Sequence, residues 1–461
     1  MENKIKMTVQ AYISGVLCTK KLYMEEHSPI LAERKEESDS FVEQNFMQVS
    51  REIIAPGGLN LNLPGDNDRY YLNKTFRELE KEKVVLYNAA FRTPSGEVAR
   101  TDVLIKDKKG IHLVEIRMVT EWTDLHLHEI SYKYHCMVQK GVIPDKISIY
   151  CINKNFILRG AGKIIDLKRG FLVSRDFTKV IKRWTNQYSR HIERFRTILL
   201  AKEAPDRDIG IYCLSPQPCI FKNHCWEHIP SNSIFDLKEM RITRQLGLYY
   251  KGIIDMEQVV EKVGNRLSDV QTVQVASALR QSIVIRREVL KEWLDRLMSK
   301  SGVYYLDIDT ERSPIPLFEG DKPFGVNIVG SRIASCLDGS SELSPEERFK
   351  PFPLNHKLQV VIDMVKKCKE DWPIVVYGRT ALDKIISQGV ENVPELADTL
   401  QGLSAKIVDL EEVFREKWYY DPRFKGSTCL HTITVALFNQ NLSEMDSMFM
   451  LIKSLSKCTK K

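Results

Sequence analysis

The sequence predicts an α/β protein with more than one domain. Residues 84–119 and 146–153 have strand periodicity, and segments with helical periodicity lie on both sides of them. A second strand-rich region starts at Val303, after a mostly helical stretch. The 461 residues correspond to two or three domains, at roughly 100–200 residues each. We therefore expect two α/β domains joined by helices, with a boundary near Gly302.

The elements follow one another in an order typical of such a protein. They are helices over 8–55 with a break at Ser28–Pro29, a turn at Pro56–Gly58, strands over 84–119, a helix over 124–140, a strand over 146–153, a helix over Asp176–Lys202, a loop over 211–230, and helices over 233–300 that end in the amphipathic stretch Ile283–Met298.

The composition is that of an ordinary globular protein. No apolar run reaches the roughly 18–20 residues of a membrane span, and the N-terminus lacks the apolar segment of a signal peptide. We expect a cytoplasmic protein with no membrane partner. The net charge of +7 is mild and permits nucleic-acid binding without requiring it. Ten cysteines in a cytoplasmic chain argue against a disulfide framework.

The segment from Lys154 to Arg196 is rich in basic residues and poor in acids. Four aromatic residues are interleaved with them, namely Phe156, Phe171, Trp184 and Tyr188. Such a segment can follow a phosphate backbone while its aromatic rings stack on bases. A solvated helix face has the same composition, so both interpretations stay open.

Four of the cysteines suggest a metal site. Cys213, Cys219 and Cys225 are equally spaced on this loop, with two prolines between the first two cysteines, and Cys18 is the best candidate for a fourth ligand. Four thiolates hold a [4Fe–4S] cluster, and such a cluster would fasten the start of the domain to its end. Zinc is the alternative, because Cys₄ and Cys₃His sites are common and the same loop contains histidines. The spacing leaves a cluster, zinc and free thiols open.

A predicted hairpin brings two carboxylates together. The strands Ala99–Lys106 and Ile111–Arg117 are joined by a turn centred on Lys108–Lys109. In this register Asp102 faces Glu115 and Arg100 faces Arg117, all on one side of the hairpin. Val103, Val114 and Ile116 occupy the other side.

The opposed carboxylates predict a cation between them. Directly opposed side chains have Cβ atoms about 4.5–5.5 Å apart, so Asp102 and Glu115 repel unless a positive group separates them. Mg²⁺ or Mn²⁺ prefers such oxygen ligands. Arg117 would lie beside the metal, where it could orient a phosphate. The alternative is a surface hairpin with ordinary cross-strand ion pairs.

These two groups of residues resemble a nuclease family. Asp102 followed by Glu115-Ile116-Arg117 resembles the core motif of PD-(D/E)XK nucleases. Cys18 before a basic Leu-Tyr segment, with three more cysteines after the core, is similar to the iron–sulfur RecB-like exonucleases associated with CRISPR systems. The resemblance implies a restriction-endonuclease-like module over residues 1–230, with a structural [4Fe–4S] cluster bound by Cys18, Cys213, Cys219 and Cys225.

The resemblance extends beyond the cysteine loop. The chain is similar to a bacterial family catalogued as domain of unknown function 2779, in the segments Cys225–Pro230, Ser233–Phe235, Tyr305–Thr310 and Pro314–Phe318. Members of that family join a RecB-like module to a DnaQ-like exonuclease domain of the ribonuclease-H fold. This implies a helical linker over 231–302 and a mixed-sheet, DnaQ-like domain over 303–461.

Both modules depart from their family patterns. At the position of the nuclease lysine stands Arg117, which keeps the charge but is a poor base. Lys133 replaces the expected glutamine on the following helix.

The second module departs further. DnaQ-like enzymes hold two metal ions with four acids, of which Asp307, Asp309 and Asp409 match three. Leu382 stands where another acid is expected, and the segment Gly426–His431 is reduced. We therefore expect this second site to be degenerate and inactive.

The resemblance implies a metal-dependent DNA nuclease, namely an exonuclease that acts on single strands or ends. Asp102 and Glu115 would bind Mg²⁺ or Mn²⁺, Arg117 would stabilise the phosphate, and Lys133 would assist. The alternative is a DNA-binding or scaffold subunit, without cleavage, in a defence or repair complex with other subunits.

Overall fold

The computed structural model describes residues 7–33, 40–61, 68–160, 163–298, 302–337, 340–343, 347–348 and 372–460. The chain forms two compact units. Unit 1 comprises Met1–Trp226 with Pro314–Phe324, and unit 2 comprises Glu227–Ser313 with Gly325–Lys461. Each unit contains a mixed sheet with helices, which confirms the expected α/β class. The helices that we assigned to a linker belong to unit 2.

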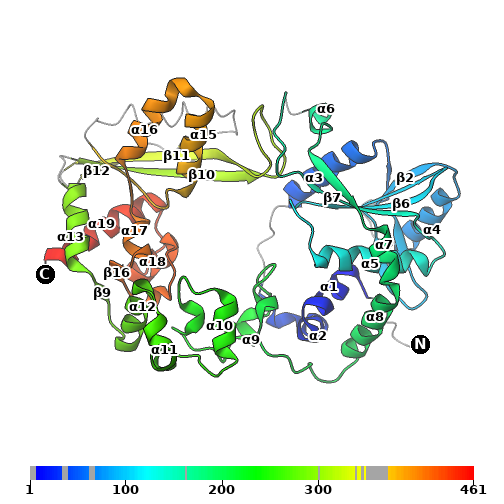
Figure 1. The fold of residues 1–461 in the computed structure, drawn as a ribbon, viewed down its shortest axis with the longest axis horizontal. Coiled ribbons are helices and arrows are strands. Elements are labelled where there is room, and N and C mark those ends of the chain that lie inside the picture. The colour runs from blue at the N-terminus through cyan, green and yellow to red at the C-terminus, as the bar shows by residue number, and fades with distance from the viewer. Residues whose placement is uncertain are drawn as a thin grey trace. The chain divides into compact units, whose positions relative to one another are not determined.

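Unit 1 is built on a six-stranded sheet in the order β1-β2-β5-β6-β7-β8 (Figure 1). The β6–β7 and β1–β2 pairs are parallel, and the other neighbours are antiparallel. The strands are β1 (Leu59–Asn60), β2 (Val84–Tyr87), β5 (Val103–Asp107), β6 (Gly110–Arg117), β7 (Lys146–Ile152) and β8 (Leu172–Asp176), and a separate ribbon pairs β3 (Ala90–Arg92) with β4 (Val98–Arg100).

Helices cover both faces of this sheet and bury two cores. Leu104 and Leu113 lie in the core under one set of helices, whereas Val103 and Val114 lie in the other core. This alternation follows from the period of two along a strand. The first core is covered by α1 (Val9–Leu17), α2 (Thr19–His27), α4 (Asp68–Leu79), α5 (Asp124–Val138), α7 (Thr178–Arg183) and α8 (Thr185–Leu199), and the second by α3 (Ser40–Ile54) and α6 (Ile164–Leu167).

The predicted hairpin register is confirmed over its central part. Val103 pairs with Val114 and Asp107 with Gly110, so the turn lies at Lys108–Lys109 as expected. The predicted pairing of Arg100 with Arg117 is wrong. The chain bends at Thr101–Asp102, and Arg100 pairs instead with Ala90 in the β3–β4 ribbon.

Two helix predictions need correction. The expected helix from Asp176 to Lys202 is divided at Trp184, whose N–H bonds to the carbonyls of Val180 and Ile181 and so tightens the end of α7. Asp176 itself ends β8. The helix expected from Ile283 begins at Arg287, because Val284–Ile285 form strand β9 against β16 (Tyr419–Tyr420).

The cysteine loop contains short helical turns. They are η2 (Ile211–Cys213) and α9 (Lys222–Cys225), and a further turn, η1 (Pro29–Leu31), follows α2.

The segment Pro314–Phe324 belongs to unit 1, where Ile315 lies in the core beneath α3. Leu158 also exchanges backbone hydrogen bonds with Gly320 and Asp321.

Unit 2 contains a six-stranded sheet, in which five strands follow the order β12-β11-β10-β14-β15 and the sixth, β13, pairs with β11. The β10–β14 and β14–β15 pairs are parallel, and β10–β11 is antiparallel. The strands are β10 (Gly302–Ser313), β11 (Gly325–Leu337), β12 (Ser340–Leu343), β13 (Glu347–Arg348), β14 (Ile374–Val376) and β15 (Ile407–Asp409).

Helices cover both faces of the second sheet as well. Tyr305 packs on the side of α13 and α19, and Leu306 packs on the side of α15 and α16. The helices are α10 (Ile242–Tyr249), α11 (Met256–Val263), α12 (Asp269–Arg280), α13 (Arg287–Met298), α15 (Thr380–Asn392), α16 (Ala397–Lys406), α17 (Glu411–Arg415), α18 (Leu430–Phe438) and α19 (Glu444–Lys460), with turns η3 (Ile234–Asp236), η4 (Gly264–Arg266), η5 (Pro394–Leu396) and η6 (Pro422–Phe424). None of the helices within the described ranges is long and apolar enough to cross a membrane.

Candidate active site and cysteine site

Two elements build the carboxylate site of unit 1. Strand β6 carries Glu115 and Arg117 on the face that α5 covers, and the bend before β5 carries Asp102. Helix α5 is buried from Ile130 to Met137, so it must lie directly on the sheet. Its residues Glu129 and Lys133 are one helical turn apart and therefore point to the same spot.

The two predicted carboxylates meet in the structure. Asp102 accepts a hydrogen bond from the Ile116 N–H at 2.8 Å, and its own N–H lies 3.4 Å from Glu115 Oε1. The Glu115 side chain is completely buried, whereas that of Asp102 is 16% exposed. The pair is therefore almost closed to water.

Two cations hold these carboxylates. The Arg117 guanidinium lies 2.9 Å from Asp102 and 3.0 Å from Glu115. The Lys133 ammonium lies 2.5 Å from Glu115 and 3.5 Å from Asp102. The structure thus brings together all four residues that the sequence singled out for this site.

Glu129 is a fifth member that the sequence analysis missed. It lies 2.9 Å from Arg117 and 3.5 Å from Lys133. The sequence feature that could have revealed Glu129 is its position four residues before Lys133 on an expected helix, which places both side chains on the same helix face. A further cation, Arg51 of α3, lies near the site. Burial lowers its pKa, while the charges of Asp102 and Glu115 act to raise it. Its guanidinium donates a hydrogen bond to Asn88.

The ion pairs perturb the proton affinities of the site. Burial alone would raise the pKa of Asp102, but Lys133 and Arg117 outweigh it and lower that pKa below its usual range. Burial and the neighbouring Asp102 raise the pKa of Glu115. Burial disfavours the Lys133 ammonium, yet the two carboxylates raise its pKa to about 12, so it stays charged near neutrality.

The site as placed does not fit Mg²⁺ or Mn²⁺. Asp102 Oδ2 already accepts from Ile116 and Arg117, and Glu115 Oε2 accepts from both Arg117 and Lys133. A divalent ion between the carboxylates would have to displace the Lys133 ammonium. Within the described part of the chain, no group of three or more His, Cys, Asp or Glu side chains is arranged to hold a metal ion.

The four predicted cysteine ligands lie near one another in unit 1. Burial raises the pKa of Cys225, the thiols of Cys213, Cys219 and Cys18 raise it further, and Lys20 lowers it. Such mutual effects require short separations, because charge interactions weaken with distance and screening. All four are free thiols.

Backbone contacts fix the cysteine loop. Cys219 donates its N–H to the Cys213 carbonyl at 2.9 Å, and Cys18 occupies the junction of α1 and α2. Glu33, just after these helices, contacts the backbone of Ile220 and Asn223. Four thiols from two distant segments therefore lie near one another. Thiolates are the ligands that iron–sulfur clusters and zinc use, but among the described residues these thiols are not arranged to hold a metal ion.

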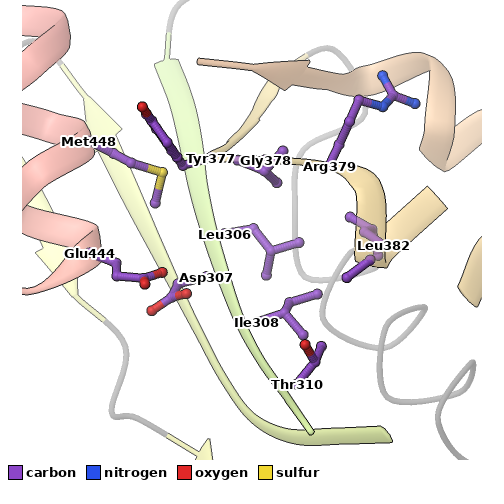
Figure 2. Close-up of a pocket in the computed structure, with 12 residues that line it drawn as sticks. Leu306, Asp307, Ile308, Thr310, Tyr377, Gly378, Arg379, Leu382, Glu444 and Met448 are labelled. Atoms are coloured by element: carbon purple, nitrogen blue, oxygen red, sulfur yellow. The ribbon is translucent and has the colours of Figure 1, made fainter. Parts of the chain in front are cut away.

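The second predicted acid site is arranged differently from our expectation. Figure 2 shows Asp307 on β10 pointing toward Glu444 at the start of α19. Burial, a hydrogen bond to Glu444 and the charges of Glu444 and Asp309 raise the pKa of Asp307 to about 7. The pair lines a small cavity of about 60 Å³. Sequence reasoning missed Glu444, although the buried spacing of Met445, Met448 and Leu455 predicts a helix there.

Of the other predicted members, Asp309 is close enough to act on the pKa of Asp307, Leu382 lines the same cavity, and only Asp409 lies apart. Leu382 points to the opposite side of β10, where it packs with Leu306 (Figure 2). Asp409 ends β15 and accepts hydrogen bonds from the N–H groups of Gly378 and Glu411. It lines a different cavity from the one that contains Asp307.

The fold and these sites define a mixed α/β protein whose first unit carries a carboxylate–cation cluster and four convergent cysteines. Residues 304–429 match the family model described as Domain of unknown function (DUF2779). This supports the family resemblance for that part of the chain, and it assigns no activity. No curated protein matches the chain.

Proposed function

We propose that the chain is a DNA-binding protein that does not cleave its ligand. Unit 1 would be a RecB-like, restriction-endonuclease-like module with a structural [4Fe–4S] cluster, and unit 2 a DnaQ-like module of the ribonuclease-H fold. The observation that carries the proposal is the closure of the Asp102–Glu115 pair by Lys133 and Arg117. A nuclease of this type needs these oxygens for its metal.

The basic segment of unit 1 supports binding to a phosphate backbone. Its cations are largely exposed, among them Lys154, Arg159, Lys163, Lys168, Arg169, Arg175, Lys179, Lys182, Arg183, Arg190 and Arg194. Arg159 and Arg169 line a cavity of about 410 Å³ together with Asn153, Asn155 and one carboxylate, that of Asp166. Cationic and amide side chains at one surface suit phosphate oxygens.

The aromatic residues of this segment do not support base stacking. Phe156 and Phe171 lie in the core beneath α3, Tyr188 lies in the other core, and Trp184 packs against it. Binding would therefore depend on charge, with little sequence preference and a strong dependence on salt.

DNA binding is tested by the fluorescence anisotropy of labelled single-stranded and duplex DNA over a range of salt concentrations. Replacing both Arg159 and Arg169 with Ala should weaken binding and reduce the salt slope by about 0.7 per lost contact on single strands. The matched control replaces Arg266 and Arg296, two exposed arginines of unit 2. Equal losses in both double variants, or no binding at low salt, would contradict the proposal.

A metal-dependent nuclease is the second candidate. It is favoured by the meeting of Asp102 with Glu115 next to Arg117, the arrangement that the family resemblance predicts. The decisive assay incubates anaerobically purified protein with labelled DNA and Mn²⁺. Cleavage by wild type that Asp102→Ala abolishes would establish nuclease activity and overturn the proposed binding without cleavage. Equal signals from both proteins would exclude nuclease activity at this site.

The cluster has its own test. Each iron of a [4Fe–4S] cluster takes one thiolate, so its four ligands stand farther apart than those of a single zinc ion. Anaerobically prepared protein should contain about four irons per chain and absorb visible light. Cys18→Ser should lose iron, and Cys336→Ser, which changes a partly buried cysteine of unit 2, should not. One zinc and no iron would contradict the cluster.

A further inference from the structure

The Lys133 ammonium occupies a position with three carboxylates around it. Glu115 is 2.5 Å away, and Asp102 and Glu129 are each 3.5 Å away. The three acids come from the bend before β5, from β6 and from α5, so they converge from different elements. Lys133 itself is only 5% exposed.

Arg117 contacts the same three acids but in another way. Its guanidinium nitrogens lie 2.9–3.0 Å from all of them, and they engage Asp102 through Oδ2. Lys133 instead approaches Asp102 Oδ1. The guanidinium is a planar fork, whereas the ammonium is a compact point charge. Of the two cations, only the lysine resembles a metal ion in shape and charge distribution.

The cluster keeps the least net charge with both cations in place. Three carboxylates with Arg117 alone would leave two negative charges in a nearly dry site, and Lys133 reduces them to one. Buried charge without a partner is strongly unfavourable. Removing the ammonium therefore creates a demand for another cation at the same point.

We infer that Lys133 substitutes for a divalent cation in a latent metal site made by Asp102, Glu115 and Glu129. Carboxylate oxygens from three elements are ligands that Mn²⁺ and Mg²⁺ accept. The inference deepens the proposed function, since it rests on the same closed cluster. Its test measures metal binding without DNA, so each idea can fail alone.

The experiment titrates Mn²⁺ into full-length protein and follows the loss of the free-ion signal by electron paramagnetic resonance. Wild type should show no site that depends on Asp102. Lys133→Gln should gain one site, which should bind Mn²⁺ at least about tenfold more tightly than any residual binding by wild type, the effect that one neighbouring group has on a metal site. Lys133→Arg keeps the charge and is the matched control, which should gain nothing.

Two further variants make the result unambiguous. Lys133→Gln combined with Glu129→Gln should lose the gained site, because one of the three ligands is gone. If Lys133→Gln is unfolded in metal-free buffer, recovery of its circular dichroism on adding Mn²⁺ supports the inference, and failure to recover contradicts it. A folded Lys133→Gln that binds no Mn²⁺, or a wild-type site that Asp102→Asn removes, overturns it.

Discussion

The stability of unit 1 should depend on Lys133. We consider Lys133→Met, which keeps an unbranched side chain of similar length and removes the charge. Glu115 is completely buried, and it would lose a partner at 2.5 Å. Removing one partner of a buried ion pair typically costs about 3–5 kcal/mol. Arg117 still contacts the same acids, so we expect the lower end, about 3 kcal/mol from the free energy of unfolding.

The assay combines urea denaturation with amide hydrogen exchange in metal-free buffer. Because the chain has two compact units, a global signal mixes their transitions, and a local signal is needed. The Ile116 N–H bonds to Asp102 and lies on β6, so peptides that cover β6 report on unit 1. Their exchange should accelerate in Lys133→Met, while peptides from α15 stay unchanged.

Two controls separate charge from packing. Lys140→Met changes an exposed lysine just beyond α5 and should alter the free energy of unfolding by less than about 0.5 kcal/mol. Adding Glu115→Gln to Lys133→Met removes the stranded charge and should restore much of the loss. The reasoning is refuted if Lys133→Met leaves both the urea transition and the β6 exchange rates at wild-type values.

Four other predictions concern positions outside this cluster. Burial lowers the pKa of His112 to about 4, so the unfolded chain takes up the proton first as the pH falls. The free energy of unfolding should therefore decrease by up to about 3 kcal/mol between pH 6.5 and pH 4. Urea titrations of His112→Gln should lack this decrease. Burial also lowers the pKa of Lys417 to about 8, so between pH 8 and 10.5 the unfolded chain binds the proton more tightly and stability should rise with pH. An equal change of melting temperature with pH in wild type and Lys417→Met would disprove this. Gly426 has a φ of +73°, and an added Cβ would collide with the Asp236 carbonyl, so Gly426→Ala should destabilise by at least about 1–3 kcal/mol. Gly402→Ala, in an open position within α16, should instead stabilise by about 0.5–1 kcal/mol.

The hairpin could be predicted because its determinants are local. Strand alternation and a four-residue turn fix which residues face each other, and the pairing of Val103 with Val114 follows from them. The same rule failed at Arg100. It assumes that a strand continues, and the chain bends at Thr101–Asp102 to supply a second ribbon. Local rules describe a strand correctly only as far as that strand extends.

The missed residues depend on contacts between distant elements. Glu129 joins the carboxylate site because α5 lies on β6, and Glu444 meets Asp307 because α19 lies on β10. Helical spacing marks the buried side of each helix, but it does not say which strand that side covers. The burial of Phe171 and Tyr188 has the same origin, since amphipathic patterns of basic and aromatic residues look alike whether the rings stack on bases or fill a core.

The two units meet the same electrostatic problem in different ways. In unit 1 the carboxylates of Asp102 and Glu115 are balanced by Lys133 and Arg117. In unit 2 the hydrogen bond between Asp307 and Glu444 accompanies a raised pKa, so a proton reduces the repulsion there. Either solution lowers the negative charge that an approaching phosphate backbone would meet. Acids that are neutralised internally do not repel a polyanion bound elsewhere on the chain, whereas free carboxylates without metal would repel it. This charge balance is therefore a physical reason to expect the proposed DNA binding without any divalent ion, and binding that persists in a chelator is its direct consequence.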